Sequence, residues 1–196
     1  MTDSFQVATK KYYHGSGTEI LGGVVQPNVA FNSVQDRTCR AAFVTSDKDQ
    51  AEFFAINHCI SGNGHIRQDG KRVYLERLSP NIKNQFYVYT VSETKENPFI
   101  HDQGTEYYAT KPIQIAEAEK FGTLNEIRRL GYEIYVLNEP LKNKMNKTLD
   151  NNFDVQAEMT KAIKEKKYHP VNIEEEMRRQ SRNVFGRMLG RILQNS

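Results

Sequence analysis

Most of the chain alternates between short apolar and polar runs, a pattern that predicts β-strands separated by turns. The dipeptide Asp69-Gly70 lies between two such runs and is a strong signal for a two-residue hairpin turn. Polar residues punctuated by Pro and Gly fill Ser92–Thr105, and loops of that length in a small domain are usually functional or disordered. We expect strands over residues 11–14, 41–45, 65–68, 71–78, 85–91, 106–115 and 132–137.

Helical spacing begins directly after the strand at residues 41–45. Ser46 is a good N-cap, and the helix that follows, from residue 47 to about residue 58, places Phe54 on its apolar face. A second, shorter helix is expected over residues 18–21, because two consecutive glycines would end it. The N-terminal half therefore predicts strands with short helices between them.

The C-terminal half predicts more helix. Thr123 and Glu126 have the spacing of a capping box, which opens a helix before the last predicted strand. The Lys- and Asn-rich stretch that follows is typical of a linker, and beyond it apolar residues form a helical stripe with arginines opposite. The prediction is an α+β fold with a domain at residues 1–140, a linker at 141–152 and a basic amphipathic helical extension at 153–196.

Composition narrows the class of protein. No apolar run approaches the roughly 20 residues needed to cross a bilayer, which excludes a membrane channel. The two cysteines, Cys39 and Cys59, are too few for a disulfide scaffold and fit a reducing compartment. The first residues have no apolar segment of the kind found in secretory signals. We expect a cytoplasmic protein, or one that acts inside a host cell, with no membrane partner.

Charge is unevenly distributed. Residues 161–196 carry nine Lys/Arg and four Glu, a net +5, although the whole chain has a formal net charge of only +3. The remainder is therefore slightly acidic. This asymmetry predicts an acidic partner for the tail and argues against a nucleic-acid-binding core.

Three short segments at strand ends could carry chemistry, although each alone also fits a purely structural role. The first is His14-Gly15-Ser16, where glycine would let a ligand approach the backbone. The second is the strand end 43–46 with the aromatic pair 53–54, which could form a slot for a flat ring. The third is Glu106 after the long loop, a carboxylate that could stabilise an oxocarbenium-like transition state on a sugar.

Taken together, the segments YYHGSGTEI, FVTSDKDQAEFF and TEYY resemble the ADP-ribosyltransferase family. The likeness is to its histidine branch, shared by diphtheria-type toxins and poly-ADP-ribose polymerases, and among small members to bacterial rifamycin ADP-ribosyltransferases. It spans roughly residues 11–137, including TLNEIRRLGYEIYVL. The chain departs from the pattern where Phe43 replaces a tyrosine, and Thr45-Ser46 resembles the arginine branch instead. The resemblance implies a split β-sheet core with short helices.

The resemblance also implies a role for each matching residue. Glu106 and His14 would be catalytic, with Glu106 on the nicotinamide ribose of NAD+ and His14 on the adenosine ribose. Gly15 would bind the nicotinamide carboxamide through its backbone, and Phe43 would stack on nicotinamide opposite one of two helix aromatics. The complete set implied to bind NAD+ is His14, Gly15, Ser16, Phe43, Thr45, Ser46, Phe53 and Phe54.

The family implies an NAD+-consuming mono-ADP-ribosyltransferase, for this chain a bacterial or phage-related toxin or effector that modifies a protein or nucleic acid. The long loop would select the acceptor through Phe99, His101 and Asp102, and residues 172–194 would dock a partner or antitoxin unless that helix packs on its own domain. The alternatives are a small-molecule (rifamycin-type) transferase, an NAD+ glycohydrolase and a non-catalytic nucleotide- or nucleic-acid-binding module. No metal is expected, because His58, Cys59 and His65 lack zinc spacing.

Overall fold

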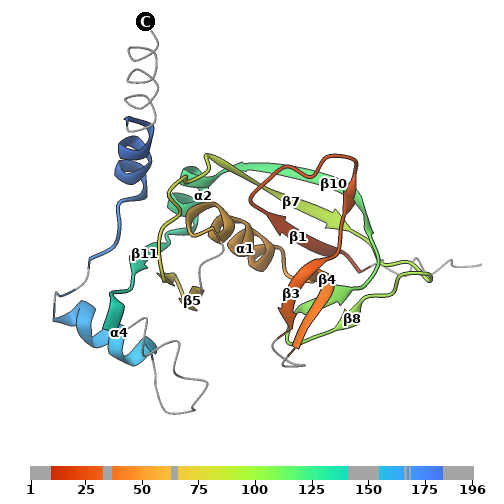
Figure 1. The fold of residues 1–196 in the computed structure, drawn as a ribbon, viewed down its shortest axis with the longest axis horizontal. Helices are drawn as coiled ribbons and strands as arrows, with labels where there is room; N and C mark the ends of the chain where they lie inside the picture. Colours follow the sequence, from red (N-terminus) through yellow and green to blue (C-terminus); the bar gives the residue numbers. More distant parts are fainter. Residues whose placement is uncertain are drawn as a thin grey trace, which may run out of the picture. The chain divides into compact units, whose positions relative to one another are not determined.

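A computed structural model describes residues 10–32, 37–62, 66–140, 155–165, 167 and 169–182 (Figure 1). The chain groups into two compact units: unit 1 comprises residues 1–56 and 85–121, and unit 2 comprises residues 57–84 and 122–196. The predicted linker at 141–152 lies outside the described residues. In the part of the chain that the structure covers, no helix is long and apolar enough to cross a bilayer.

Unit 1 is built on an eight-stranded sheet in which the strand order is β2-β10-β7-β1-β4-β9-β8, with β3 paired to β4. The pairings have antiparallel register, so that strands distant in sequence become neighbours. The strands are β1 (Tyr12–Ser16), β2 (Val24–Val25), β3 (Asn28–Asn32), β4 (Arg37–Thr45), β7 (Gln85–Val91), β8 (Ile100–His101), β9 (Glu106–Ala109) and β10 (Ile113–Gly122).

In the middle of the unit 1 sheet, the neighbouring strands β1 and β4 are paired over a very short stretch. Strand β1 pairs with β7 over five residues, and β4 pairs with β9 over four. Between the described residues of β1 and β4, by contrast, the register consists of the single pair Tyr13↔Thr45. We call the line between β1 and β4 beyond this pair the seam. It divides the sheet into two halves, between which the one register pair of described residues is Tyr13↔Thr45.

Alternation along the strands gives the sheet two different faces. One face carries a cluster of buried apolar side chains that includes Tyr12, Val44 and Tyr89. The other face is covered near β1 by helix α1 (Lys48–Ile60), whose backbone lies so close that a Cβ at Gly15 would fall 2.0 Å from the Ala51 carbonyl oxygen (Figure 1). Glycine is required at position 15 because nothing larger fits beneath the helix.

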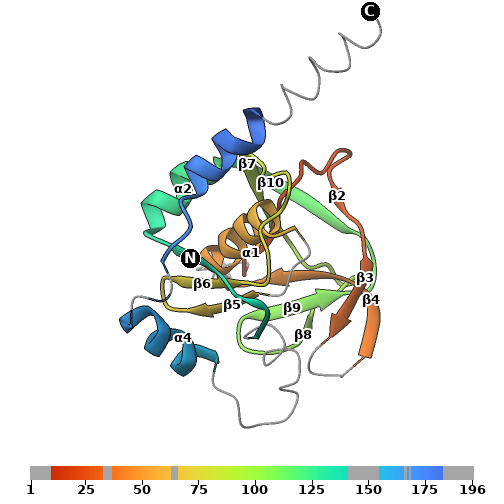
Figure 2. The same cartoon turned by 60° about the vertical axis from the view of Figure 1, so that its left-hand side comes forward.

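Unit 2 takes in the last turn of α1 and a three-stranded sheet of order β11-β6-β5 (Figure 2). Its strands are β5 (Ile66–Asp69), β6 (Arg72–Leu75) and β11 (Glu133–Val136), and its helices are α2 (Thr123–Leu130), α4 (Val155–Lys164) and a helix at residues 173–182. Tyr74, Tyr135, Leu137 and Met159 form a buried cluster between the sheet and α4. The predicted hairpin around Asp69-Gly70 is confirmed as β5–β6.

The α+β class is confirmed, but several local predictions were wrong. Residues 18–21 are not helical: a turn occupies residues 21–23. The strand predicted at 106–115 is two strands, because the chain turns at residues 110–112, around Pro112, which cannot donate to a ladder. Thr123 is the first residue of α2 rather than its cap, which is Gly122.

The described part of the C-terminal extension contains two helices, α4 and residues 173–182, with non-helical residues between them. The second of these helices packs on its own unit: Ile173 is buried, and the Gln180 amide accepts from the Ile82 N–H and donates to the Ser79 carbonyl, each at 2.9 Å. Residues 183–194 of the predicted docking surface lie outside the described residues.

Candidate functional site

Glu106 opens β9 beside the end of β4, where Thr45 is its register partner. A tight turn fixes its backbone: the Glu106 N–H donates to the Gln103 carbonyl at 2.7 Å, and its own carbonyl accepts from the Asp102 N–H at 2.9 Å. The left-handed conformation of Gly104, with φ of 53°, makes this turn possible. The carboxylate is therefore carried by a backbone that is bonded on both sides.

A side-chain amide holds the carboxylate itself. Gln50, in the first turn of α1, donates from Nε2 to Oε1 of Glu106 at 2.9 Å. Its own oxygen accepts from the Thr45 hydroxyl at 2.6 Å and from the Thr105 hydroxyl. The Ser46 N–H donates to the Thr105 carbonyl at 2.9 Å and closes the end of the strand pair. Sequence reasoning missed Gln50 and Thr105, because nothing local distinguishes residues whose partners lie more than fifty positions away.

The environment of Glu106 favours its protonated form. Burial is the largest cause of a raised pKa, the nearby Asp102 carboxylate adds to it, and the hydrogen bond from Gln50 opposes it. Among the described residues, Oε2 of Glu106 has no hydrogen-bond partner. The site thus presents one held oxygen and one open oxygen on a half-buried carboxyl group.

His14 lies at the seam on the other face of the sheet, one residue beyond the Tyr13–Thr45 pair. Its Nδ1 lies 2.8 Å from the Phe43 carbonyl oxygen of β4, and its ring stacks on Tyr89 of β7 with centroids 6.4 Å apart. Because a carbonyl only accepts, Nδ1 carries a hydrogen and donates it to the Phe43 carbonyl. The imidazole links the two halves of the sheet.

The other two residues of the first segment have structural roles in addition to any binding role. Gly15 admits the backbone of α1, as described above. The Ser16 hydroxyl donates to the Thr18 carbonyl at 2.7 Å and accepts from the Thr18 N–H at 3.2 Å, so it forms the local turn. Ser46 is not the N-cap predicted for α1: Asp47 is, with Oδ1 accepting from the Asp49 N–H at 3.0 Å.

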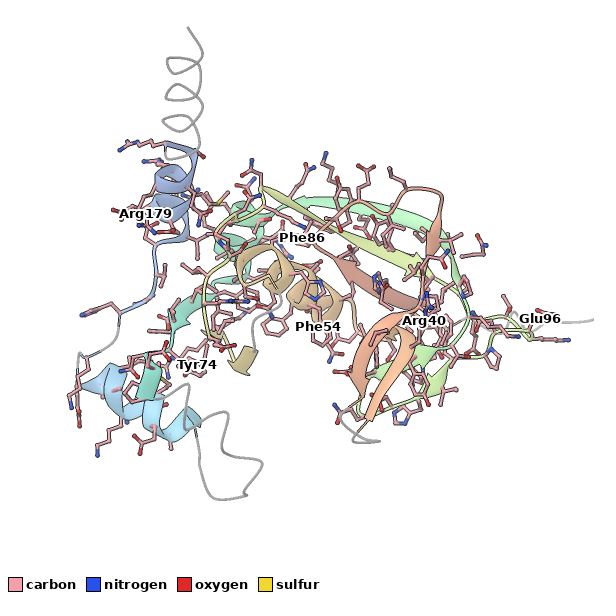
Figure 3. All side chains as sticks on the ribbon, in the orientation of Figure 1. Arg40, Phe54, Tyr74, Phe86, Glu96 and Arg179 are labelled. Carbon is pink, nitrogen blue, oxygen red and sulfur yellow. The ribbon has the colours of Figure 1, made fainter. Side chains whose placement is uncertain are left out.

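The two aromatic residues of α1, Phe53 and Phe54, differ in their exposure to solvent. Phe53 is 8% exposed and belongs to the core, whereas Phe54 is 38% exposed (Figure 3) and contradicts its predicted place on the apolar face. Phe54 follows Gln50 by four residues, so the two share a side of α1. Phe43 precedes Thr45 by two residues and shares its sheet face with Thr45 and Glu106. The half-buried Phe43 and exposed Phe54 thus belong to the same face as the carboxylate.

Of the three residues predicted to contact an acceptor, Phe99 is buried and therefore poorly placed to do so. It is 9% exposed and packs edge-on against Tyr12, with ring centroids 4.9 Å apart, within the apolar cluster. His101 is exposed, donates from Nε2 to the Gly104 carbonyl at 3.0 Å and packs on Tyr107. Asp102 is half-buried and close enough to Glu106 to affect its pKa. The loop meets the candidate site at Asp102.

No group of three or more His, Cys, Asp or Glu side chains in the described part of the chain could hold a metal ion. No protein-family model, curated protein or solved structure matches this chain. The site is therefore interpreted from its own geometry.

Proposed function

We propose that this chain is an NAD+-dependent mono-ADP-ribosyltransferase with its site in unit 1. The observation that carries the proposal is the Glu106 carboxyl group, which is fixed through Oε1 and open at Oε2. An open carboxylate oxygen on a rigid strand end suits a ribose hydroxyl, and its negative charge stabilises an oxocarbenium-like transition state. Strands β1, β4 and β9, which carry the three segments that resemble the family, are neighbours in the sheet.

The aromatic residues fit the flat ring of nicotinamide. Phe43 keeps the stacking surface that a tyrosine would supply, and the exposed Phe54 is the helix aromatic available to face a ligand. A dinucleotide at the strand ends of the seam would meet Phe43 and Phe54 on the face of the carboxylate, whereas His14 lies on the opposite face of the sheet and Gly15 is covered by α1.

In the proposed reaction the bond from ribose C1′ to the nicotinamide nitrogen breaks, and nicotinamide leaves as a neutral base with both bonding electrons. A lone pair of the acceptor attacks C1′ from the opposite face, which inverts the configuration, and the acceptor loses a proton to solvent. Glu106 stabilises the positive charge that develops on the ribose. The acceptor is proposed to be a macromolecule, with Asp102 as the loop residue nearest the attacking group.

The test measures nicotinamide release from NAD+ by the purified chain. Replacing Glu106 with Gln removes the charge but keeps the shape, and we expect at least a roughly 100-fold lower rate with NAD+ binding retained. His14→Ala should raise KM for NAD+. Glu117→Gln, an exposed carboxylate on β10, is the matched control and should change nothing.

Three outcomes would redirect the proposal. Binding of NAD+ without cleavage, with cell extract supplying acceptors, would make the chain a non-catalytic module. Cleavage with no covalent adduct by mass spectrometry would make it an NAD+ glycohydrolase. An adduct only on a small molecule would favour the rifamycin-type alternative.

A further inference from the structure

We infer that Gln50 is the positioning residue that aims the open oxygen of Glu106 at the substrate, an inference that rests on the proposed function. The geometry lies wholly within unit 1 and joins the strand ends of β4 and β9 to the first turn of α1. Gln50 contacts the carboxylate and not the reacting atoms, so its action is exerted through Glu106.

The orientation of the Gln50 amide is set by two hydroxyl groups. Its oxygen accepts from Thr45 and Thr105, which leaves its nitrogen to face Glu106. In a flipped amide the Thr45 oxygen, which already accepts from the Asp47 N–H at 3.1 Å, would have to accept a second hydrogen bond, and its O–H would lose the Gln50 oxygen as an acceptor. A flipped amide would also bring its oxygen against an ionised carboxylate. The network therefore has one favoured direction.

That direction determines which carboxylate oxygen is left for a ligand. The side chain of Glu106 starts from a backbone bonded at both its N–H and its carbonyl, and Gln50 then holds Oε1. With these points fixed, the carboxyl group cannot rotate without breaking the 2.9 Å bond. Oε2 is the oxygen that remains without a hydrogen bond to a described residue. Preorganised contacts of this kind place a charged group before substrate binds.

The amide also affects the ionisation of the site. Burial and the Asp102 carboxylate raise the pKa of Glu106, and the hydrogen bond from Gln50 acts in the opposite direction because it favours the ionised form. Removing the amide should raise that pKa further. At any pH close to the pKa, a smaller fraction of Glu106 would then be ionised. As the pH is lowered, activity that needs the ionised form would be lost sooner, at a higher pH than in the unsubstituted chain.

The experiment follows the titration of Glu106 directly, by carbon-13 NMR of its carboxyl group in the full chain. Gln50→Met keeps the length and helix propensity of the side chain but cannot donate. We expect a higher pKa of Glu106 in Gln50→Met and a smaller rise in Thr105→Val, which keeps the amide but loses one of its two supports. Gln114→Met, on an exposed position of β10, makes the same chemical change elsewhere and should leave the titration unchanged.

Nicotinamide release is measured on the same variants. Gln50→Met should lower the rate at neutral pH by about 10- to 100-fold and move the acid limb of the pH profile upward. An unchanged Glu106 titration in both Gln50→Met and Thr105→Val would overturn the inference, whatever the rate. A shifted titration in a chain that never cleaves NAD+ would overturn the proposed function and leave the hold of Gln50 on Glu106 established.

Discussion

Unit 1 and unit 2 each contain a glutamine whose side-chain amide both donates and accepts hydrogen bonds, and the two amides have different partners. In unit 2, Gln180 bonds to the backbone of residues 79–82 and fixes a helix to a loop, and its nitrogen also donates to the Glu176 carboxylate at 3.1 Å. In unit 1, the bonds of the Gln50 amide to described residues go to side chains, one of them ionisable. The Glu176 carboxylate is already paired with Arg179, whereas Glu106 has no ion-pair partner among the described residues and is held by the neutral amide of Gln50.

The charged groups of the two units differ in the same way. In unit 2, Glu174 pairs with Arg128 and Arg178 at the surface, where water competes for every ion and each pair contributes little. In unit 1, Glu106 is drawn partly out of water and held by a neutral donor. Such an arrangement lowers stability at neutral pH, since the folded chain resists the ionisation that the unfolded chain permits. Unit 1 thus loses stability at Glu106 as the pH rises through the pKa of that carboxyl group.

The strongest way to break unit 1 alone is Gly15→Ala. The new methyl group would meet the Ala51 carbonyl oxygen at 2.0 Å, so β1 or α1 must move, at a cost of about 3 kcal/mol. Urea denaturation measures the loss, and amide hydrogen exchange should rise in β1 and β4 more than in β6 and β11. Gly122→Ala meets only the flexible Asn125 side chain, at 3.3 Å, and should cost less than about 1 kcal/mol. Equal losses would show that the close approach at Gly15 is unimportant.

An effect of similar size should separate the neighbours Phe53 and Phe54. Phe53→Ala removes a core ring and should lower the free energy of unfolding by about 3 kcal/mol. Phe54→Ala removes an exposed ring, so stability should change by less than about 1 kcal/mol while KM for NAD+ rises. Thermal melts and nicotinamide-release kinetics on both variants test this. An unchanged KM in Phe54→Ala would remove Phe54 from the proposed ring slot.

The smallest effect should come from the glutamine of unit 2. Gln180→Met leaves the Ile82 N–H and Ser79 carbonyl without their partner and should cost about 1 to 2 kcal/mol in unit 2. Nicotinamide release per folded molecule and the titration of Glu106 should not change. Arg178→Ala, which breaks only a surface ion pair, is the control and should cost less than about 1 kcal/mol. An altered Glu106 titration in Gln180→Met would mean that the two units are energetically coupled.

The sequence predicted what depends on neighbouring residues. Alternation located β7 at residues 85–91, and Asp69-Gly70 located the hairpin. Local signals failed where several residues compete for one role: Ser46 was predicted as the cap of α1, but Asp47 occupies it because Ser46 continues from the strand end. Sequence alone could not weigh such alternatives.

In the candidate site, too, the residues proposed from the sequence belong to short local motifs, and the one that was missed depends on distant partners. His14, Phe43 and Glu106 were found through short motifs, and their strands are adjacent in the sheet. Gln50 could not be found, because its importance comes from Thr105 and Glu106, which only the folded sheet brings near it. Which of the neighbours Phe53 and Phe54 is buried depends on how α1 packs, and the sequence around them does not show it.

The link from His14 to Phe43 has a consequence for how the two halves of the sheet evolve. A backbone ladder survives almost any substitution, because every residue except proline supplies the same N–H and carbonyl groups. Across the seam, one connection is instead an imidazole bonded to a carbonyl. A single residue therefore contributes both to the continuity of the sheet and to the chemistry proposed at the seam, so a substitution at His14 puts both at risk.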